Sequence, residues 1–111
     1  MCHCRQCQQA QGVGFACNFA IPETECIIQD EENLLTAFRS SATKQRMFCS
    51  RCGSPLYSKR DDSQDLRIRA GSLDDSTKLQ VTEHIFADDA PLWSPINDRL
   101  PTHKGFEPTR K

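Results

Sequence analysis

Hydrophobic and polar residues alternate along several short stretches of this chain, as they do in half-buried β-strands. Residues 66–71, LRIRAG, give the clearest alternation, with Leu66 and Ile68 on one face and Arg67 and Arg69 on the other. Weaker strand patterns cover residues 15–21, 26–29, 34–38, 44–49 and 82–86. The pattern therefore predicts a mostly β protein with short strands and long loops.

One helical segment and an irregular tail complete the prediction. Residues 5–11, RQCQQAQ, are expected to form a turn or two of helix that ends at Gly12 and Gly14. After Asp88 the chain is rich in proline, which predicts an extended, irregular segment. No internal repeat or linker divides the 111 residues, so we expect residues 1–111 to form a single domain.

Charge and composition exclude several classes of function. The formal net charge is −1, with 14 basic and 15 acidic residues, so we expect no nucleic-acid partner and no membrane partner. No apolar run approaches the roughly 20 residues that span a bilayer, and no secretory signal layout is seen. We therefore expect a cytoplasmic protein, in which clustered cysteines bind metal or do chemistry more often than they form disulfides.

Five of the seven cysteines fall in two short motifs. Cys2, Cys4 and Cys7 form C-x-C-x-x-C, and Cys49 and Cys52 form a second C-x-x-C. A C-x-x-C turn directs two thiolates at one tetrahedral ion, and a third thiolate leaves one position open. Three protein ligands are typical of a zinc ion that meets a substrate, whereas four closed ligands mark a structural one.

Spacing alone leaves alternatives open. In the simplest interpretation, one closed site has four cysteine ligands: Cys4, Cys7, Cys49 and Cys52. Cys2 then takes no part in it. That protein would be a non-catalytic zinc-binding structural or interaction module. A thiol redox protein, in which Cys4 and Cys7 cycle without metal, is a third option.

Other cysteines and histidines carry more ordinary expectations. Cys17 and Cys26 lie in strand patterns, and we expect small buried side chains there, although they are the first candidates for replacement structural ligands. We expect His3 to point outward and His103 to be solvated. His84 could shuttle protons, but a hydrogen-bonded structural role is favoured.

Five segments resemble a known family, the glutathione-dependent formaldehyde-activating enzymes, which also includes centromere protein V. The segments are CHCRQCQQAQG (2–12), GFACNFAIP (14–22), FCSRCGSPLYS (48–58), RIRAGSLDD (67–75) and EHIFADDAPLW (83–93). The resemblance implies a small zinc-binding, β-tent-like fold of short antiparallel sheets. It also implies that Cys2, Cys4 and Cys7 hold a catalytic zinc ion, while Cys49 and Cys52 belong to a separate structural zinc site.

The chain departs from the family pattern at one place. The family normally supplies two more structural ligands from a C-x-C-G segment upstream of the catalytic motif, and here that motif begins at Cys2. Either the start is truncated or this member has lost the structural site, so we expect one or two Zn²⁺ ions with an incomplete second site. A missing strand would also expose a sheet edge that could pair with a second copy as a homodimer.

The resemblance implies a carbon–sulfur lyase. In the family reaction the thiol of glutathione adds to formaldehyde and gives S-hydroxymethylglutathione. We expect this reaction or the formation of a related small-thiol adduct, with Cys2, Cys4 and Cys7 holding the catalytic zinc and the fourth position open to the substrate sulfur or a water. The expected partner is glutathione or a similar small thiol.

Overall fold

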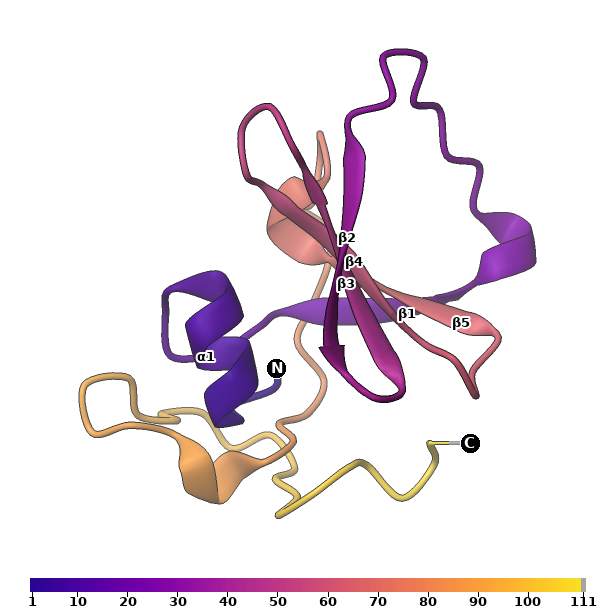
Figure 1. Cartoon of the computed structure of the whole chain (residues 1–111). Helices are drawn as coiled ribbons and strands as arrows, with labels where there is room; N and C mark the ends of the chain where they lie inside the picture. Colours follow the sequence, from indigo (N-terminus) through magenta and orange to yellow (C-terminus); the bar gives the residue numbers. More distant parts are fainter. Residues whose placement is uncertain (111) are drawn as a thin grey trace. The chain divides into compact units, whose positions relative to one another are not determined.

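A single antiparallel sheet dominates the computed structural model, which describes residues 1–110 (Figure 1). Its spatial order is β1-β5-β4-β3-β2. The five strands are β1 (Asn18–Pro22), β2 (Leu35–Ser41), β3 (Lys44–Cys49), β4 (Pro55–Arg60) and β5 (Asp65–Arg69). The prediction of a mostly β protein with short strands and long loops is confirmed.

Strands β2 to β5 pair with their neighbours in sequence, because short loops return the chain at each end. Strand β1 then pairs along the outer side of β5, with Phe19 opposite Ile68. The register shifts between Arg39 and Ser41, so the outer strand β2 is irregular near its end. Leu66 is only 1% exposed, and its strand, β5, lies between β1 and β4 in the sheet.

The individual strand predictions differ in quality. Residues 44–49 coincide with β3, and the strand predicted over 34–38 continues to Ser41. The strand predicted over 26–29 is wrong, because this segment pairs with no other and leaves Ile27 87% exposed. Strand β4 has no counterpart in the prediction, since the buried residue Ser58 interrupts its apolar pattern with a polar side chain.

The predicted helix is α1 (Arg5–Gln11), the segment that carries Cys7. Cys4 is its N-cap residue, and Gly12 ends it with a φ of 71° while its N–H donates to the carbonyl of Gln8 (2.8 Å). A residue with a side chain would be strained in this left-handed conformation. Three short 3₁₀ helices, Glu23–Glu25, Ala70–Ser72 and Ala87–Asp89, complete the regular structure.

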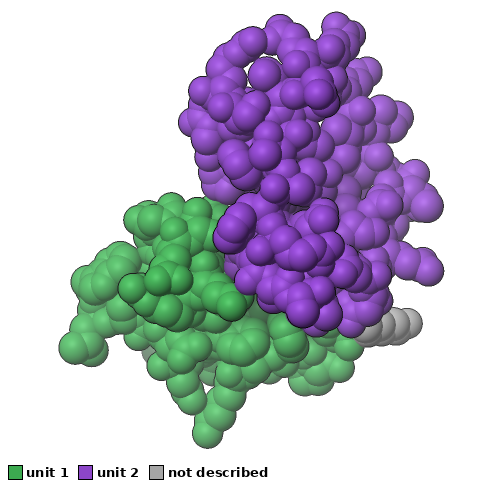
Figure 2. Space-filling model, in the orientation of Figure 1, with its two compact units in different colours: residues 1–17, 75–111 green, residues 18–74 purple. Residues whose placement is uncertain are grey.

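The chain divides into two compact units (Figure 2). Unit 2, residues 18–74, contains the sheet. Unit 1 joins residues 1–17 to residues 75–111 and therefore draws its elements from both ends of the sequence. Isolated β-bridges take the place of the strand predicted over 82–86.

The irregular tail predicted after Asp88 is held to the rest of unit 1 by backbone hydrogen bonds. His84 N–H donates to the carbonyl of Pro101 (2.9 Å), and His103 N–H donates to the carbonyl of His84 (2.9 Å). Near the start of this tail, Leu92 and Trp93 are exposed. Within residues 1–110, no helix has the length and apolar character needed to span a membrane.

Candidate metal centre

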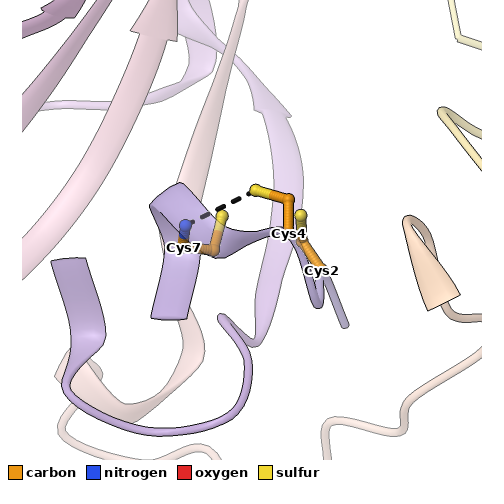
Figure 3. A group of neighbouring side chains, drawn as sticks. All are labelled: Cys2, Cys4 and Cys7. Atoms are coloured by element: carbon orange, nitrogen blue, oxygen red, sulfur yellow. Dashed lines mark hydrogen bonds between the residues drawn. The ribbon is translucent and has the colours of Figure 1, made fainter. Parts of the chain in front are cut away.

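Three thiols meet in unit 1 at the N-terminal end of α1 (Figure 3). The sulfur atoms of Cys2, Cys4 and Cys7 all lie within 4.8 Å of one another. Cys2 lies on a β-bridge with Ala16, Cys4 caps α1, and Cys7 follows in the helix three residues later. Residues three apart in a helix project in similar directions, so the C-x-x-C spacing points both thiols at one position.

Backbone contacts of α1 favour negative charge at the cluster. The N–H of Cys7 donates to Sγ of Cys4 at 3.4 Å, which is the dashed contact in Figure 3. Cys4 thereby satisfies one of the helix's unpaired amides, as Ser or Asp does at other N-caps. A donor aimed at sulfur also stabilises a thiolate more than a neutral thiol.

Hydrogen bonding among the thiols, together with burial, disfavours a charged Cys2 when no cation is bound. Cys2 and Cys7 are buried, whereas Cys4 is partly exposed. Without an ion, the pKa of the Cys2 thiol is raised far above its ordinary value of 9.0, first by hydrogen bonding with Cys4 and Cys7 and then by burial. Thiolates in such a group repel one another unless a positive ion lies between them.

The donor set fits a zinc ion. Zn–S bonds of about 2.3 Å at tetrahedral angles place sulfur atoms about 3.8 Å apart, which is compatible with the observed cluster. Cys2, Cys4 and Cys7 could therefore hold a metal ion. Soft thiolate donors are those that zinc accepts in proteins.

A pair of buried histidines, His3 and His84, adjoins the cysteine cluster in sequence at His3, and the sequence patterns did not predict this pair. His3 is not exposed as expected but only 2% exposed, and its Nε2 lies 2.8 Å from Nδ1 of His84, which is also 2% exposed. Nε2 of His84 in turn lies 2.9 and 3.0 Å from the carboxylate oxygens of Asp98. The hydrogen-bonded structural role expected for His84 is confirmed, and the outward orientation expected for His3 is wrong.

Further contacts fix the backbone between the thiols. The side-chain amide of Gln8 donates to the carbonyls of His3 (2.9 Å) and Asp89 (2.9 Å). His3 N–H donates to the carbonyl of Ile85 (3.1 Å), whose own N–H donates to the carbonyl of Met1 (2.9 Å). Met1 and His3 are therefore held by residues more than 80 positions later in the chain.

The second cysteine motif lies in unit 2, where the chain turns from β3 into β4. Gly53 N–H donates to the carbonyl of Cys49 (2.7 Å), which closes the turn, and Cys52 is exposed with its Sγ 3.1 Å from Oγ of Ser54. The Ser54 side chain, then its backbone, then the Cys49 side chain lower the pKa of the Cys52 thiol. Within the described residues of unit 2, no third metal-ligating side chain joins this pair.

The remaining predictions for single residues receive mixed support. Cys17 and Cys26 are half-buried and free, so neither is the fully buried side chain that we expected. His103 is half-buried rather than fully solvated, and its Nε2 contacts the carboxylate of Glu83 at 2.8 Å. This second histidine–carboxylate pair also lies in unit 1. Its side chains bond to each other, whereas the His3 ring bonds to His84.

The fold and this cluster together define a class: mostly β proteins with a three-cysteine centre that could hold a metal ion. A comparison with protein families narrows that class. The family model described as glutathione-dependent formaldehyde-activating enzyme matches residues 1–89, so the chain belongs to that family. A search of the curated proteins finds no match. Members of the family are enzymes of the formaldehyde-activating, carbon–sulfur lyase type, which suggests a role related to glutathione and formaldehyde.

Proposed function

We propose that this chain is a zinc-dependent carbon–sulfur lyase that forms S-hydroxymethylglutathione or a related small-thiol adduct. The observation that carries the proposal is the cluster of Cys2, Cys4 and Cys7, combined with membership of the family. Within the described residues, no fourth His, Cys, Asp or Glu joins the group, which leaves a ligand position for a small thiol. Residues 1–111 act together as one catalytic domain in this proposal.

The reaction balances without an oxidant or a reductant. The sulfur of the thiol bonds to the carbon of formaldehyde, the C=O π bond breaks, and the thiol proton ends on oxygen to give S–CH₂–OH. A bound zinc ion supplies a stabilised thiolate and polarises carbonyl groups. The chain itself contributes three sulfur ligands, an N–H from Cys7 to Cys4, and burial that limits water around Cys2.

Metal analysis combined with exchange kinetics tests the proposal. Formaldehyde and glutathione also combine unaided, so the measurement is the exchange rate between free and adducted ¹³C-formaldehyde by NMR. We expect the wild type to exceed the uncatalysed rate, and Cys4→Ser to lose both zinc and the rate increase. Cys26→Ser, which alters a half-buried cysteine outside the cluster, is the matched control. A Cys4→Ser variant that exchanges as fast as the wild type would eliminate the lyase proposal.

The second candidate is a non-catalytic zinc-binding structural or interaction module that uses Cys49 and Cys52, which lie together on the turn between β3 and β4. Zinc content separates the two candidates when Cys2→Ser is compared with Cys52→Ser. The three-thiol site predicts zinc loss in Cys2→Ser and retention in Cys52→Ser, whereas a module that depends on Cys52 predicts zinc loss in Cys52→Ser.

Pairing with a second copy through a sheet edge also belongs to this proposal. The outer strands are β1 and β2; Pro22 in β1 and the register shift after Arg39 in β2 oppose long edge pairing. The stretch of β2 around the exposed Phe38 is therefore the edge that we favour. Sedimentation should show a dimer that Phe38→Lys dissociates, and a wild type that is monomeric at its highest soluble concentration would contradict this.

None of the seven cysteines, all of which lie within residues 1–110, forms a disulfide bond, and this supports a reducing compartment. A cytoplasmic location is therefore the one we propose. Fractionation of cells that express the protein should recover it with other cytoplasmic proteins, and recovery from an oxidising compartment with intact disulfides would contradict the proposal.

A further inference from the structure

We propose that His84 and Asp98 are positioning residues for the three-cysteine centre and act on it through His3. The inference rests on the proposed metal site and adds residues that take no part in binding the ion. His3 stands between Cys2 and Cys4 in sequence, so whatever fixes His3 also fixes the backbone on which both thiols are carried. Its ring and its N–H are held by residues more than 80 positions later in the chain.

The first support is the continuity of the chain of contacts. His3 Nε2 meets His84 Nδ1 at 2.8 Å, and His84 Nε2 meets the Asp98 carboxylate at 2.9 Å. Both rings are almost fully buried, where each unpaired polar atom would cost about 1–3 kcal/mol. A buried polar pair of this kind holds its members in one arrangement, because no nearby water can replace a lost partner.

The second support is direction. An ionised carboxylate can only accept, so Nε2 of His84 donates to Asp98 and Nδ1 of the same ring faces Nε2 of His3 at 2.8 Å. Asp98 is itself held, because one of its carboxylate oxygens accepts from the N–H of Leu100 (3.1 Å). Asp98 thus fixes the orientation of the His84 ring, and His84 in turn positions the ring of His3.

The third support is that the backbone of His3 is fixed independently. Its carbonyl accepts from Gln8 Nε2 (2.9 Å), and its N–H donates to the carbonyl of Ile85 (3.1 Å). Nε2, the carbonyl and the N–H of His3 therefore each take part in a hydrogen bond, which presets the backbone that carries Cys2 and Cys4 before an ion arrives. Residues that support metal ligands from behind change metal affinity by limiting the conformations that the ligands must lose on binding.

The test is zinc affinity of the full-length chain, measured by competition with a chromophoric chelator. Asp98→Ala and His84→Gln should each weaken zinc binding about 10-fold. Asp98→Asn keeps a carbonyl oxygen as acceptor and should restore most of the affinity. His103→Gln is the matched control, since it breaks the His103–Glu83 pair in the same unit and should leave zinc affinity unchanged. An equal loss in the control would show a general structural effect and would overturn the inference.

A double-mutant cycle separates positioning from simple destabilisation. If Asp98 acts through His3, then Asp98→Ala should cost no further affinity in a His3→Ala background. Additive losses would overturn the inference. Cobalt substitution gives a second readout, because the visible spectrum of bound Co²⁺ should change in Asp98→Ala and not in His103→Gln.

The outcomes also distinguish this inference from the proposed function. A wild type that binds zinc with an affinity equal to that of Asp98→Ala overturns the positioning role and leaves the metal centre intact. A wild type that binds no zinc overturns both. Loss of affinity in Asp98→Ala, together with an absence of lyase activity in the wild type, supports the positioning role and rejects the lyase.

Discussion

Gly14 occupies a position in unit 1 where no side chain fits. A Cβ built on Gly14 would lie 2.3 Å from Oγ and 2.4 Å from Cβ of Ser94. Gly14→Ala should therefore force the segment that carries Ser94 to move, at a cost of about 1–3 kcal/mol in the free energy of unfolding. Thermal unfolding measures this cost.

Two companion variants show whether the clash is the cause. Gly105→Ala in the same unit meets no atom within 4 Å and should leave the melting temperature nearly unchanged. The double variant Gly14→Ala with Ser94→Gly removes the colliding atoms and should recover much of the lost stability. A Gly14→Ala protein as stable as the wild type would show that the two segments do not pack as described.

Leu66 and Leu92 form a natural comparison of one residue type in opposite environments. Leu66 is 1% exposed and Leu92 is 99% exposed. Leu66→Ala should destabilise the protein by about 2–5 kcal/mol, because it removes buried methyl groups and leaves a cavity in the sheet. Leu92→Ala should change the free energy of unfolding by less than about 0.5 kcal/mol. Urea titrations of both variants would measure the difference.

Single residues also show what the sequence could and could not reveal about the site. The cysteine cluster was predictable, because the three cysteines lie within six positions and their spacing brings the sulfur atoms together. The His3–His84–Asp98 contacts were not, because the partners are 81 and 14 positions apart and a lone histidine has no spacing to read. Only the fold brings such residues together.

At the scale of elements, α1 is short, and its two ends depend on single residues. Gly12 at its C-terminal end has a φ of 71° and no atom near its missing Cβ, so a substitution there tests backbone strain alone. Gly12→Ala should cost about 1 kcal/mol in the free energy of unfolding, while Gly12→Asn should cost less because Asn tolerates this conformation. Equal losses for both, measured by thermal unfolding, would contradict the strain argument.

Sequence patterns identified best the elements with a strand-like or helix-like arrangement of apolar and polar residues and a clear end. Strand β3 and helix α1 match the predicted boundaries, whereas β5 begins one residue before and ends two residues before the predicted strand 66–71. Residues 26–29 include the β-branched Ile27 and Ile28 but pair with no strand. Their β-propensity alone therefore gave a wrong strand prediction. Strand β4 was missed because its buried residue, Ser58, is polar, so no apolar alternation marks the strand.

At the scale of the whole molecule, unit 1 depends on residues beyond the family match. The match ends at residue 89, whereas Asp98 and the segment that includes Pro101 and His103 contact His84 through hydrogen bonds. A chain ending at residue 89 should therefore lose the positioning contact and the backbone pairing of His84. We expect weaker zinc binding than in the full chain and faster proteolysis within residues 1–17.

The same truncation has an internal control. Unit 2 forms its sheet from residues 18–69 without the deleted tail, so its strands should retain their amide protection in hydrogen exchange. Loss of protection in β3 and β4 as well would show that the two units unfold together. Intact protection of both units in the shortened chain would show that the tail is dispensable.

Trp93 is the only tryptophan of the chain and is 68% exposed. It lies between Asp89, whose carbonyl accepts from Gln8, and Ser94, which packs against Gly14. Its fluorescence can therefore report on residues 89–94, which contact Gln8 and Gly14, with no dye or engineered probe. Titrating metal into the unmodified protein while recording that emission would show whether metal binding by Cys2, Cys4 and Cys7 changes the environment of Trp93.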